Sequence, residues 1–152
     1  MIEEIVNYHK YNEKLAAGGQ PTAEQLEALK NEGYEVIVNI STPSARNFLH
    51  REHSEVENLG MYYVHFPVDC SALDPVHYST FSGIMKGISG RKVFVHCGGN
   101  IKSSNLIHMY HVLEEGMDER ISFETLLKIQ EPEEKWNNYF KMMGMRGVYA
   151  EI

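Results

Sequence analysis

The stretch that most constrains the fold is KVFVHCGG at residues 92–99, where a short apolar run meets two glycines. An apolar run such as Val93 to Val95, bounded by polar residues, is typical of a buried strand. Beyond the glycines, apolar residues recur at helical spacing from Leu106 to Leu113, and Gly116 ends this pattern. The stretch therefore predicts a strand, a turn that begins at Cys97, and a helix.

The turn between this strand and this helix has the composition of an anion-binding loop. Glycine lets the backbone approach a ligand closely, and the N-terminus of a helix adds partial positive charge. The backbone N–H groups that can converge on one anion belong to Gly98, Gly99, Asn100, Ile101 and Lys102. Because the same field favours a nucleophilic thiolate, the sequence predicts a reactive Cys97 beside an anion site.

Length and composition limit the class of protein. With 152 residues, 43% of them hydrophobic, residues 1–152 are expected to form a single domain with its own core. No apolar run reaches the roughly eighteen residues of a membrane helix, and the acidic start MIEEIV is unlike a signal peptide, so a cytoplasmic protein is expected. A net charge of −7 argues against a nucleic-acid or anionic-membrane partner, and two cysteines offer no disulfide scaffold.

Capping and apolar patterns in the rest of the chain predict alternating helices and strands. Residues 22–25 form a capping box for a helix that ends near Gly33, and Asp74-Pro75 predicts the start of another helix. The other expected elements are strands over 34–40 and 61–68, a mostly helical connection over 44–59, and two C-terminal helices around 123–127 and 136–143. This alternation predicts an α/β fold, with a mainly parallel central sheet of about four to five strands flanked by helices.

The His96-Cys97 pair, the glycine loop and the cation and hydroxyl that follow resemble the signature of the cysteine-dependent protein tyrosine and dual-specificity phosphatases. That signature has five residues between cysteine and arginine, which would place Ser103 at the arginine. A loop of four residues places Lys102 there instead, and is similar to a bacterial phosphatase-like family with Cys-x4-Arg and an upstream Gly-Gln-Pro. GQP stands here at residues 19–21, and the resemblance covers nearly the whole chain. We prefer this second register because it keeps a cation at the arginine's position.

The resemblance implies a fold like that of dual-specificity phosphatases and a phosphomonoester hydrolase that forms a phosphocysteine on Cys97, without metal or other cofactor. Lys102 and the loop amides would hold the phosphate, and Ser103 would stabilise the thiolate when the phosphocysteine breaks down. His96 would lie behind the loop, where it would hydrogen-bond the backbone and help to keep the thiolate charged. The expected partner is a phosphorylated protein or a small phosphomonoester.

The resemblance also implies a general acid, an aspartate roughly thirty residues before the cysteine on a loop. Asp69 lies 28 residues before Cys97 and directly follows the second expected strand. Asp74 competes with it, but capping of the helix at Pro75 explains Asp74, so Asp69 is favoured. Cys70 is either a partner for a reversible disulfide with Cys97 or an incidental thiol.

Because position 102 is lysine rather than arginine, the sequence does not decide whether the protein catalyses hydrolysis. Arginine offers a planar fork to phosphate oxygens, whereas lysine is a point charge on a flexible stem, so we expect catalysis to weaken more than binding. One alternative is a catalytically silent relative that binds phosphorylated ligands. A less favoured one is a sulfurtransferase of rhodanese type, whose cysteine also lies in an amide-lined loop. The GQP motif and the segment FPVD at residues 66–69 fit the phosphatase better.

Overall fold

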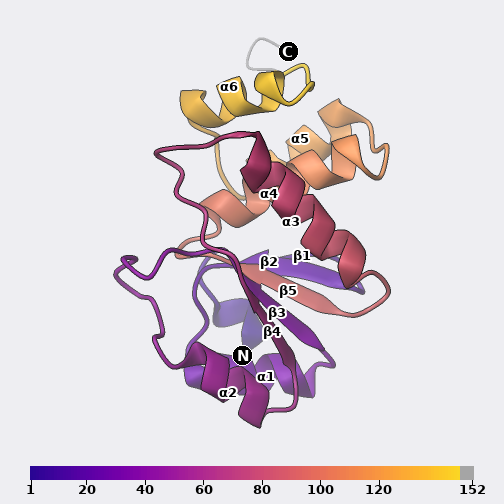
Figure 1. Cartoon of the computed structure of the whole chain (residues 1–152). Coiled ribbons are helices and arrows are strands. Elements are labelled where there is room, and N and C mark those ends of the chain that lie inside the picture. The colour runs from indigo at the N-terminus through magenta and orange to yellow at the C-terminus, as the bar shows by residue number, and fades with distance from the viewer. Residues whose placement is uncertain (148–152) are drawn as a thin grey trace.

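The computed structural model describes residues 1–147 and shows an α/β fold built on a five-stranded sheet (Figure 1). The strands are β1 (His9–Asn12), β2 (Leu15–Gly18), β3 (Val36–Asn39), β4 (Tyr62–His65) and β5 (Val93–His96). The helices are α1 (Ala23–Asn31), α2 (Glu52–Asn58), α3 (Pro75–Gly87), α4 (Ile101–Leu113), α5 (Glu119–Leu127) and α6 (Glu134–Met142), after a short 3-10 helix η1 (Ile2–Glu4).

The strand order is β1-β2-β5-β3-β4, in which β1 pairs antiparallel with β2 and the other pairs are parallel. In this register His96 lies opposite Gly18 of β2 and Asn39 of β3. The carboxyl ends of β2, β3, β4 and β5 therefore meet at one edge of the sheet. Ligand sites of parallel sheets occur at this edge, and the loop of Cys97 begins there.

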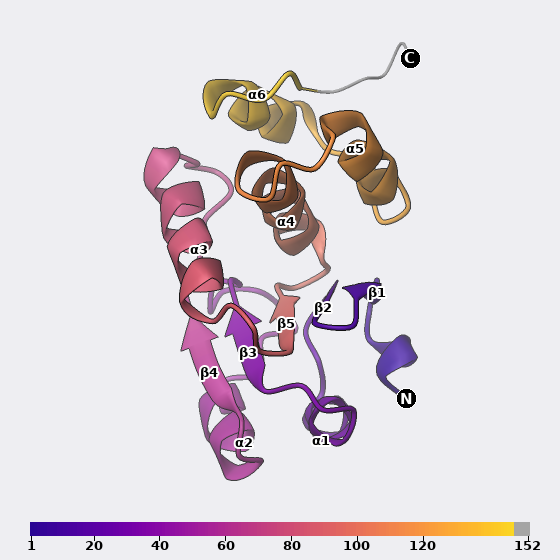
Figure 2. The ribbon, with the colours of Figure 1, turned by 90° about the vertical axis from the view of Figure 1, so that its right-hand side faces the viewer.

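Helices cover both faces of the sheet. In Figures 1 and 2, α1 and α2 lie on one face and α3 to α6 on the other. Val93 and Val95 belong to the core on the α3–α6 side, whereas Phe94 belongs to the core on the α1–α2 side, as the alternation of a strand requires. Strands β2, β3 and β5 are accordingly buried along their whole length. Within residues 1–147, no helix is long and apolar enough to cross a membrane.

Most of the predicted elements are confirmed. Thr22 accepts from the Gln25 N–H and closes the predicted capping box of α1, and Asp74 caps α3 directly before Pro75. Strands β3 and β4 lie inside their predicted ranges, β5 ends directly before Cys97, and α5 and α6 overlap the predicted C-terminal helices. The predicted fold class, a mainly parallel sheet flanked by helices, is confirmed as well.

The segment before α2 differs from its prediction. Of the expected helical connection over 44–59, only Glu52–Asn58 is helical, and residues 44–51 form turns. Short polar side chains explain the difference, because they bond elsewhere instead of allowing a helix. The hydroxyls of Thr42 and Ser44 bond to each other, and Asn47 donates to the carbonyl oxygen of Gly98.

The hairpin of β1 and β2 is a second difference, because the sequence prediction contains no strand before residue 34. Strand β2 has the sequence LAAG, without a β-branched or aromatic residue that would indicate a strand. It is extended because it pairs in parallel with β5 and antiparallel with β1. Strand β1 is an edge strand of four residues, too short for a clear alternating pattern.

Candidate functional site

The loop that carries Cys97 leaves β5 and enters α4 at Ile101. Cys97 is only 1% exposed, and Asn100, the N-cap of α4, adopts the left-handed conformation with a φ of 68°, which asparagine tolerates better than most residues. Within the described residues, none of the backbone N–H groups from Gly98 to Ser103 donates to a protein acceptor. The loop thus offers a series of free donors at a helix N-terminus, an arrangement that binds phosphate groups.

Neighbouring segments hold the carbonyl groups of this loop. Asn47 Nδ2 donates to the Gly98 carbonyl oxygen at 2.9 Å, and Asn7 Nδ2 donates to that of Gly99 at 3.0 Å. Asn100 Nδ2 in turn donates to the Asn7 carbonyl oxygen at 2.8 Å. Because the C=O and N–H of a trans peptide point in opposite directions, these contacts turn the N–H groups of Gly99 and Asn100 away from the supporting segments.

The Gly-Gln-Pro motif at residues 19–21 lies directly against the loop. Gly19 forms a bridge with Gly99, and the backbone N–H of Gln20 donates to the Gly98 carbonyl oxygen at 3.2 Å. A Cβ at position 19 would lie 2.6 Å from that oxygen, so a larger residue fits only if the backbone moves. The motif therefore supports the loop from outside.

We expect Gly19→Ala to deform the loop and to lower the free energy of unfolding by about 1–3 kcal/mol, since its methyl group meets backbone rather than a movable side chain. Urea unfolding measures the stability, and calorimetry measures phosphate binding. Gly83→Ala in α3 is the matched control, because a Cβ there meets nothing within 4 Å and alanine favours a helix. Equal losses in the two variants would contradict this role of Gly19.

His96 lies behind the loop, between the backbone of Cys97 and the carboxylate of Glu52. Its Nε2 is 2.6 Å from Glu52 Oε2, and its Nδ1 is 3.3 Å from the Cys97 carbonyl oxygen. Glu52 is buried, and its Oε1 accepts from Gln20 Nε2. Both carboxylate oxygens therefore have a hydrogen-bond partner, as burial of such a group requires.

Lys102 at the start of α4 lies close to Asp69 in the segment that follows β4. Lys102 Nζ donates to the carbonyl oxygen of Val68, the residue before Asp69. The exposed Asp69 carboxylate accepts from the Ser71 hydroxyl at 2.7 Å and from the Ser71 N–H at 2.9 Å. These two hydrogen bonds, followed by the positive charges of Lys102 and His77, lower the pKa of Asp69 below its usual value.

The remaining site candidates from the sequence are Asp74, Ser103 and Cys70, and their hydrogen bonding differs. The carboxylate of Asp74 accepts from the Val76 N–H at 2.8 Å, so it serves the start of α3. Ser103 is fully buried, and its hydroxyl has no hydrogen-bond partner among residues 1–147, which leaves it available to a group held in the loop. Cys70 and Cys97 are both free thiols, and Cys70 accepts from Lys135 Nζ at 3.5 Å.

Sequence reasoning missed three residues that hold this loop, namely Asn7, Asn47 and Glu52. Asn7 and Asn47 bond to the loop from distant segments, and Glu52 bonds to His96 directly before it; no regular spacing relates the three residues to Cys97. The one available signal is the Gly-Gln-Pro motif, since Gln20 contacts Glu52.

A mainly parallel sheet with a cysteine loop at its carboxyl edge and a helix directly after it is typical of protein tyrosine and dual-specificity phosphatase folds. Residues 3–141 match the family described as "DSP-PTPase phosphatase fused to NAD+ Kinase", and the chain belongs to this family. The resemblance inferred from the sequence is thereby confirmed. A search among curated protein sequences found no significant match.

Solved structures share the fold. A DUF442 protein from Shewanella putrefaciens CN-32, named as a phosphatase, is 22% identical with a TM-score of 0.84, and the alignment covers 97% of both chains. TpbA from P. aeruginosa in complex with pTyr is 14% identical with a TM-score of 0.66, over 80% of this chain and 72% of that chain. PTPMT1 in complex with PI(5)P is 14% identical with a TM-score of 0.72, over 89% and 92% of the two chains.

Proposed function

We propose that residues 1–152 form one phosphatase-like domain that hydrolyses phosphomonoesters through a cysteine nucleophile. The observation that carries this proposal is the loop of Cys97, with a thiol at the end of β5 and free N–H groups from Gly98 to Ser103. Such donors would hold the non-bridging oxygens of a phosphate while the thiolate attacks phosphorus in line with the leaving oxygen.

In the proposed reaction, Cys97 Sγ forms a bond to phosphorus while the bond from phosphorus to the ester oxygen breaks. Asp69 donates a proton to the leaving oxygen and later takes one from the water that attacks the phosphocysteine, so phosphate and the thiolate are released. Ser103, whose hydroxyl has no partner among the described residues, would donate to the departing thiolate. The substrate would be a phosphorylated protein or a small phosphomonoester, in line with the pTyr and PI(5)P complexes of TpbA and PTPMT1.

Hydrolysis of para-nitrophenyl phosphate under reducing conditions, from mildly acidic to neutral pH, tests the proposal. We expect turnover that vanadate inhibits, together with a phosphocysteine on the Cys97 peptide when the reaction is quenched with acid. Absence of turnover and of vanadate binding would contradict the proposal. Transfer of sulfur from thiosulfate to cyanide would instead support the sulfurtransferase alternative.

Lys102→Arg is expected to raise kcat/KM for para-nitrophenyl phosphate about tenfold to a hundredfold. The reason is that a guanidinium fork adds a charge-assisted hydrogen bond of about 1–3 kcal/mol to the transition state, which lysine makes less well. Lys10→Arg is the matched control, because Lys10 lies in β1 and pairs with the exposed Glu13. Equal or lower activity in Lys102→Arg would mean that the loop is adapted to lysine.

A second candidate function is phosphate binding without turnover. The observation that favours it is the hydrogen bond from Lys102 Nζ to the Val68 carbonyl oxygen. Lys102 is the one cationic residue of the segment 97–103, and this bond engages its ammonium group with the protein backbone. This candidate predicts that the natural protein binds phosphate and vanadate but is inert, and that turnover arises only in Lys102→Arg. The same comparison of variants therefore separates the two candidates.

A further inference from the structure

We propose that Glu52 is a positioning residue that keeps His96 protonated on both ring nitrogens and so stabilises the thiolate of Cys97. The inference deepens the proposed function and rests on it, because Cys97 is taken as its reactive thiol. Glu52 does not reach the loop itself, so its effect passes through the imidazole ring.

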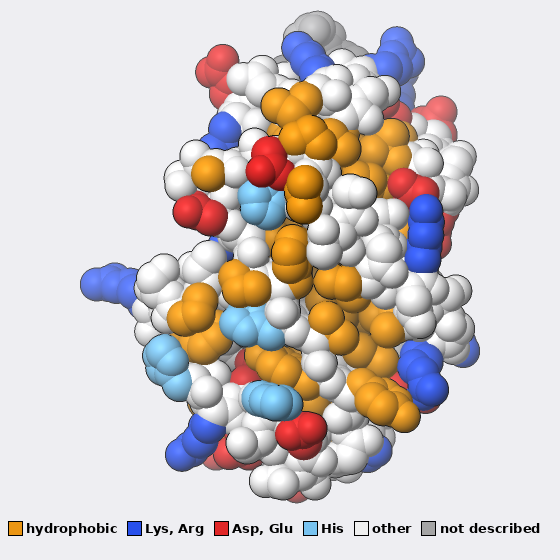
Figure 3. Space-filling view, viewed as in Figure 1, with side chains coloured by type: hydrophobic (Ala, Val, Ile, Leu, Met, Phe, Trp, Pro, Cys, Tyr) orange, Lys and Arg blue, Asp and Glu red, His pale blue; other side chains and the backbone are white. Residues whose placement is uncertain are grey.

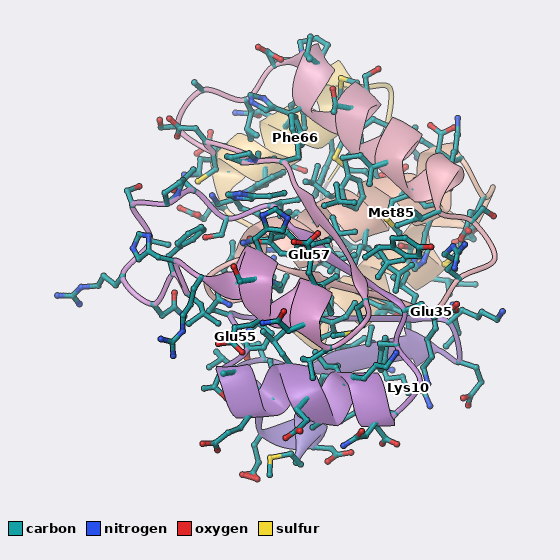
Figure 4. The ribbon with its side chains drawn as sticks, turned by 60° about the horizontal axis from the view of Figure 1, so that its bottom comes forward. Lys10, Glu35, Glu55, Glu57, Phe66 and Met85 are labelled. Carbon is teal, nitrogen blue, oxygen red and sulfur yellow. The ribbon has the colours of Figure 1, made fainter. Side chains whose placement is uncertain are left out.

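The contact between Glu52 and His96 is enclosed within the protein. Their side chains are 1% and 0% exposed, and Oε2 and Nε2 lie 2.6 Å apart. Glu52 is the first residue of α2, and His96 is the last residue of β5. Figure 4 looks onto α1 and α2, which lie in front of the sheet in that view. The pair therefore links the helical layer on this face to the strand that carries the cysteine loop.

The hydrogen-bond partners determine where the protons lie. The Cys97 carbonyl oxygen can only accept, so His96 Nδ1 must carry a proton to bond to it at 3.3 Å. The short contact between Nε2 and Oε2 holds a second proton, as in charge-assisted hydrogen bonds. Gln20 Nε2 donates to the other carboxylate oxygen, so both oxygens of Glu52 are engaged. We place this second proton on Nε2, so that the ring is an imidazolium.

The ring of His96 lies between the Glu52 carboxylate and the Cys97 backbone. The negative charge of Glu52 lies at Nε2, and the Cys97 backbone lies at the opposite nitrogen, Nδ1. The positive ring is therefore nearer to Cys97 than the carboxylate is, so the pair favours negative charge on the thiol. Without Glu52 the buried ring would lose its positive charge, since an unpaired charge in a site with 0% exposure is costly.

Other titratable groups lie around this pair. Burial, and then the negative charge of Glu52, raise the pKa of Tyr63, so its phenol stays neutral and accepts from Asn39 Nδ2 at 2.9 Å. His53 stacks on Tyr63 with ring centroids 5.5 Å apart and pairs with Glu57 at 3.2 Å. His50, His53 and His65 line a surface hollow that Glu52 also borders, on the face where Figure 3 shows histidine and hydrophobic side chains together. The Glu52 carboxylate contacts Gln20 and His96, and the Tyr63 phenol lies close enough to interact with it as well.

Glu52→Gln tests the charge while it keeps the hydrogen bonds. The amide oxygen can accept from Gln20, and the amide N–H can donate to Nε2 of a neutral His96 that still carries a proton on Nδ1. We expect the pH midpoint for alkylation of Cys97 by iodoacetamide, measured by mass spectrometry on the Cys97 peptide, to rise by about one unit. Hydrolysis at mildly acidic pH should fall about tenfold for the same reason.

Glu55→Gln is the matched control for this experiment. Glu55 lies on the same helix, where Figure 4 labels it, and pairs with the exposed Arg51 at 3.3 Å. Its substitution changes the net charge by the same amount without a contact to His96. We expect the alkylation midpoint of Glu55→Gln to equal that of the natural protein, and an equal shift in both variants would overturn the proposal.

Nitrogen NMR of the His96 ring in the natural protein is a second test that needs no variant. The proposal predicts an imidazolium at neutral pH, and a neutral ring would overturn it even if Glu52→Gln did not fold. An unchanged alkylation midpoint in folded Glu52→Gln would overturn it as well. If the natural protein shows no turnover but the alkylation midpoint shifts in Glu52→Gln, the proposed function fails and the role of Glu52 stands. If turnover requires Cys97 but the midpoint does not shift, the proposed function stands and the role of Glu52 fails.

Discussion

Cys97→Ser is expected to lower the hydrolysis of aryl phosphates by at least about a thousandfold, while phosphate binding is retained. A serine hydroxyl is a weak nucleophile at neutral pH unless a general base removes its proton. His96 cannot serve as that base, because Glu52 and the Cys97 carbonyl oxygen engage its two ring nitrogens. The backbone N–H groups of the loop do not depend on the thiol, so the anion site remains in the variant.

The two halves of this expectation need separate measurements. The kcat for para-nitrophenyl phosphate reports the chemical step, and calorimetric titration with phosphate reports the anion site. Cys70→Ser is the matched control, because Cys70 is the other free thiol and its sulfur contacts Lys135 rather than the loop. Turnover that survives in Cys97→Ser would exclude the thiol as nucleophile, whereas loss of turnover in both variants would point to damage of the fold.

Parts of this fold could be predicted because local hydrogen bonds determine them. Thr22 and Gln25 close the start of α1 across three residues, and Asp74 caps α3 in the same way. Strand β2 shows the opposite case, since its four residues have no strand propensity of their own and are extended through pairing with β5. The turns at residues 44–51 could not be predicted either, because the side chain of Asn47 donates to the Gly98 carbonyl oxygen, 51 residues away in sequence.

The same distinction applies to the candidate site. Cys97 and the loop N–H groups could be placed from sequence because they lie within one strand, turn and helix. Glu52 could not, since it meets His96 across 44 residues and through the packing of α2 against the sheet. A glutamate at the start of a polar helix has the pattern of an exposed residue, and only the fold shows that it is buried.

Asp69→Asn is expected to slow the hydrolysis of alkyl phosphates by about a hundredfold to ten-thousandfold, and that of para-nitrophenyl phosphate much less. An alkoxide is a poor leaving group that needs a proton, whereas para-nitrophenolate leaves without one. Asparagine keeps the oxygen that accepts from Ser71, so the loop retains its hydrogen bonds. Asp74→Asn is the matched control, because asparagine caps a helix as well as aspartate does. A larger loss in Asp74→Asn would assign the general acid to Asp74.

The pH profile tests the same role independently. Because the pKa of Asp69 is lowered, chiefly by Ser71 and then by Lys102 and His77, its protonated form is abundant in the free protein only at acidic pH. For alkyl phosphates, kcat/KM should therefore fall as the pH rises through this lowered pKa. Ser71→Ala removes the hydroxyl that contributes most to the lowering, so the pKa rises and the falling limb moves to higher pH. An unmoved limb in Ser71→Ala would mean that a group other than Asp69 supplies the proton.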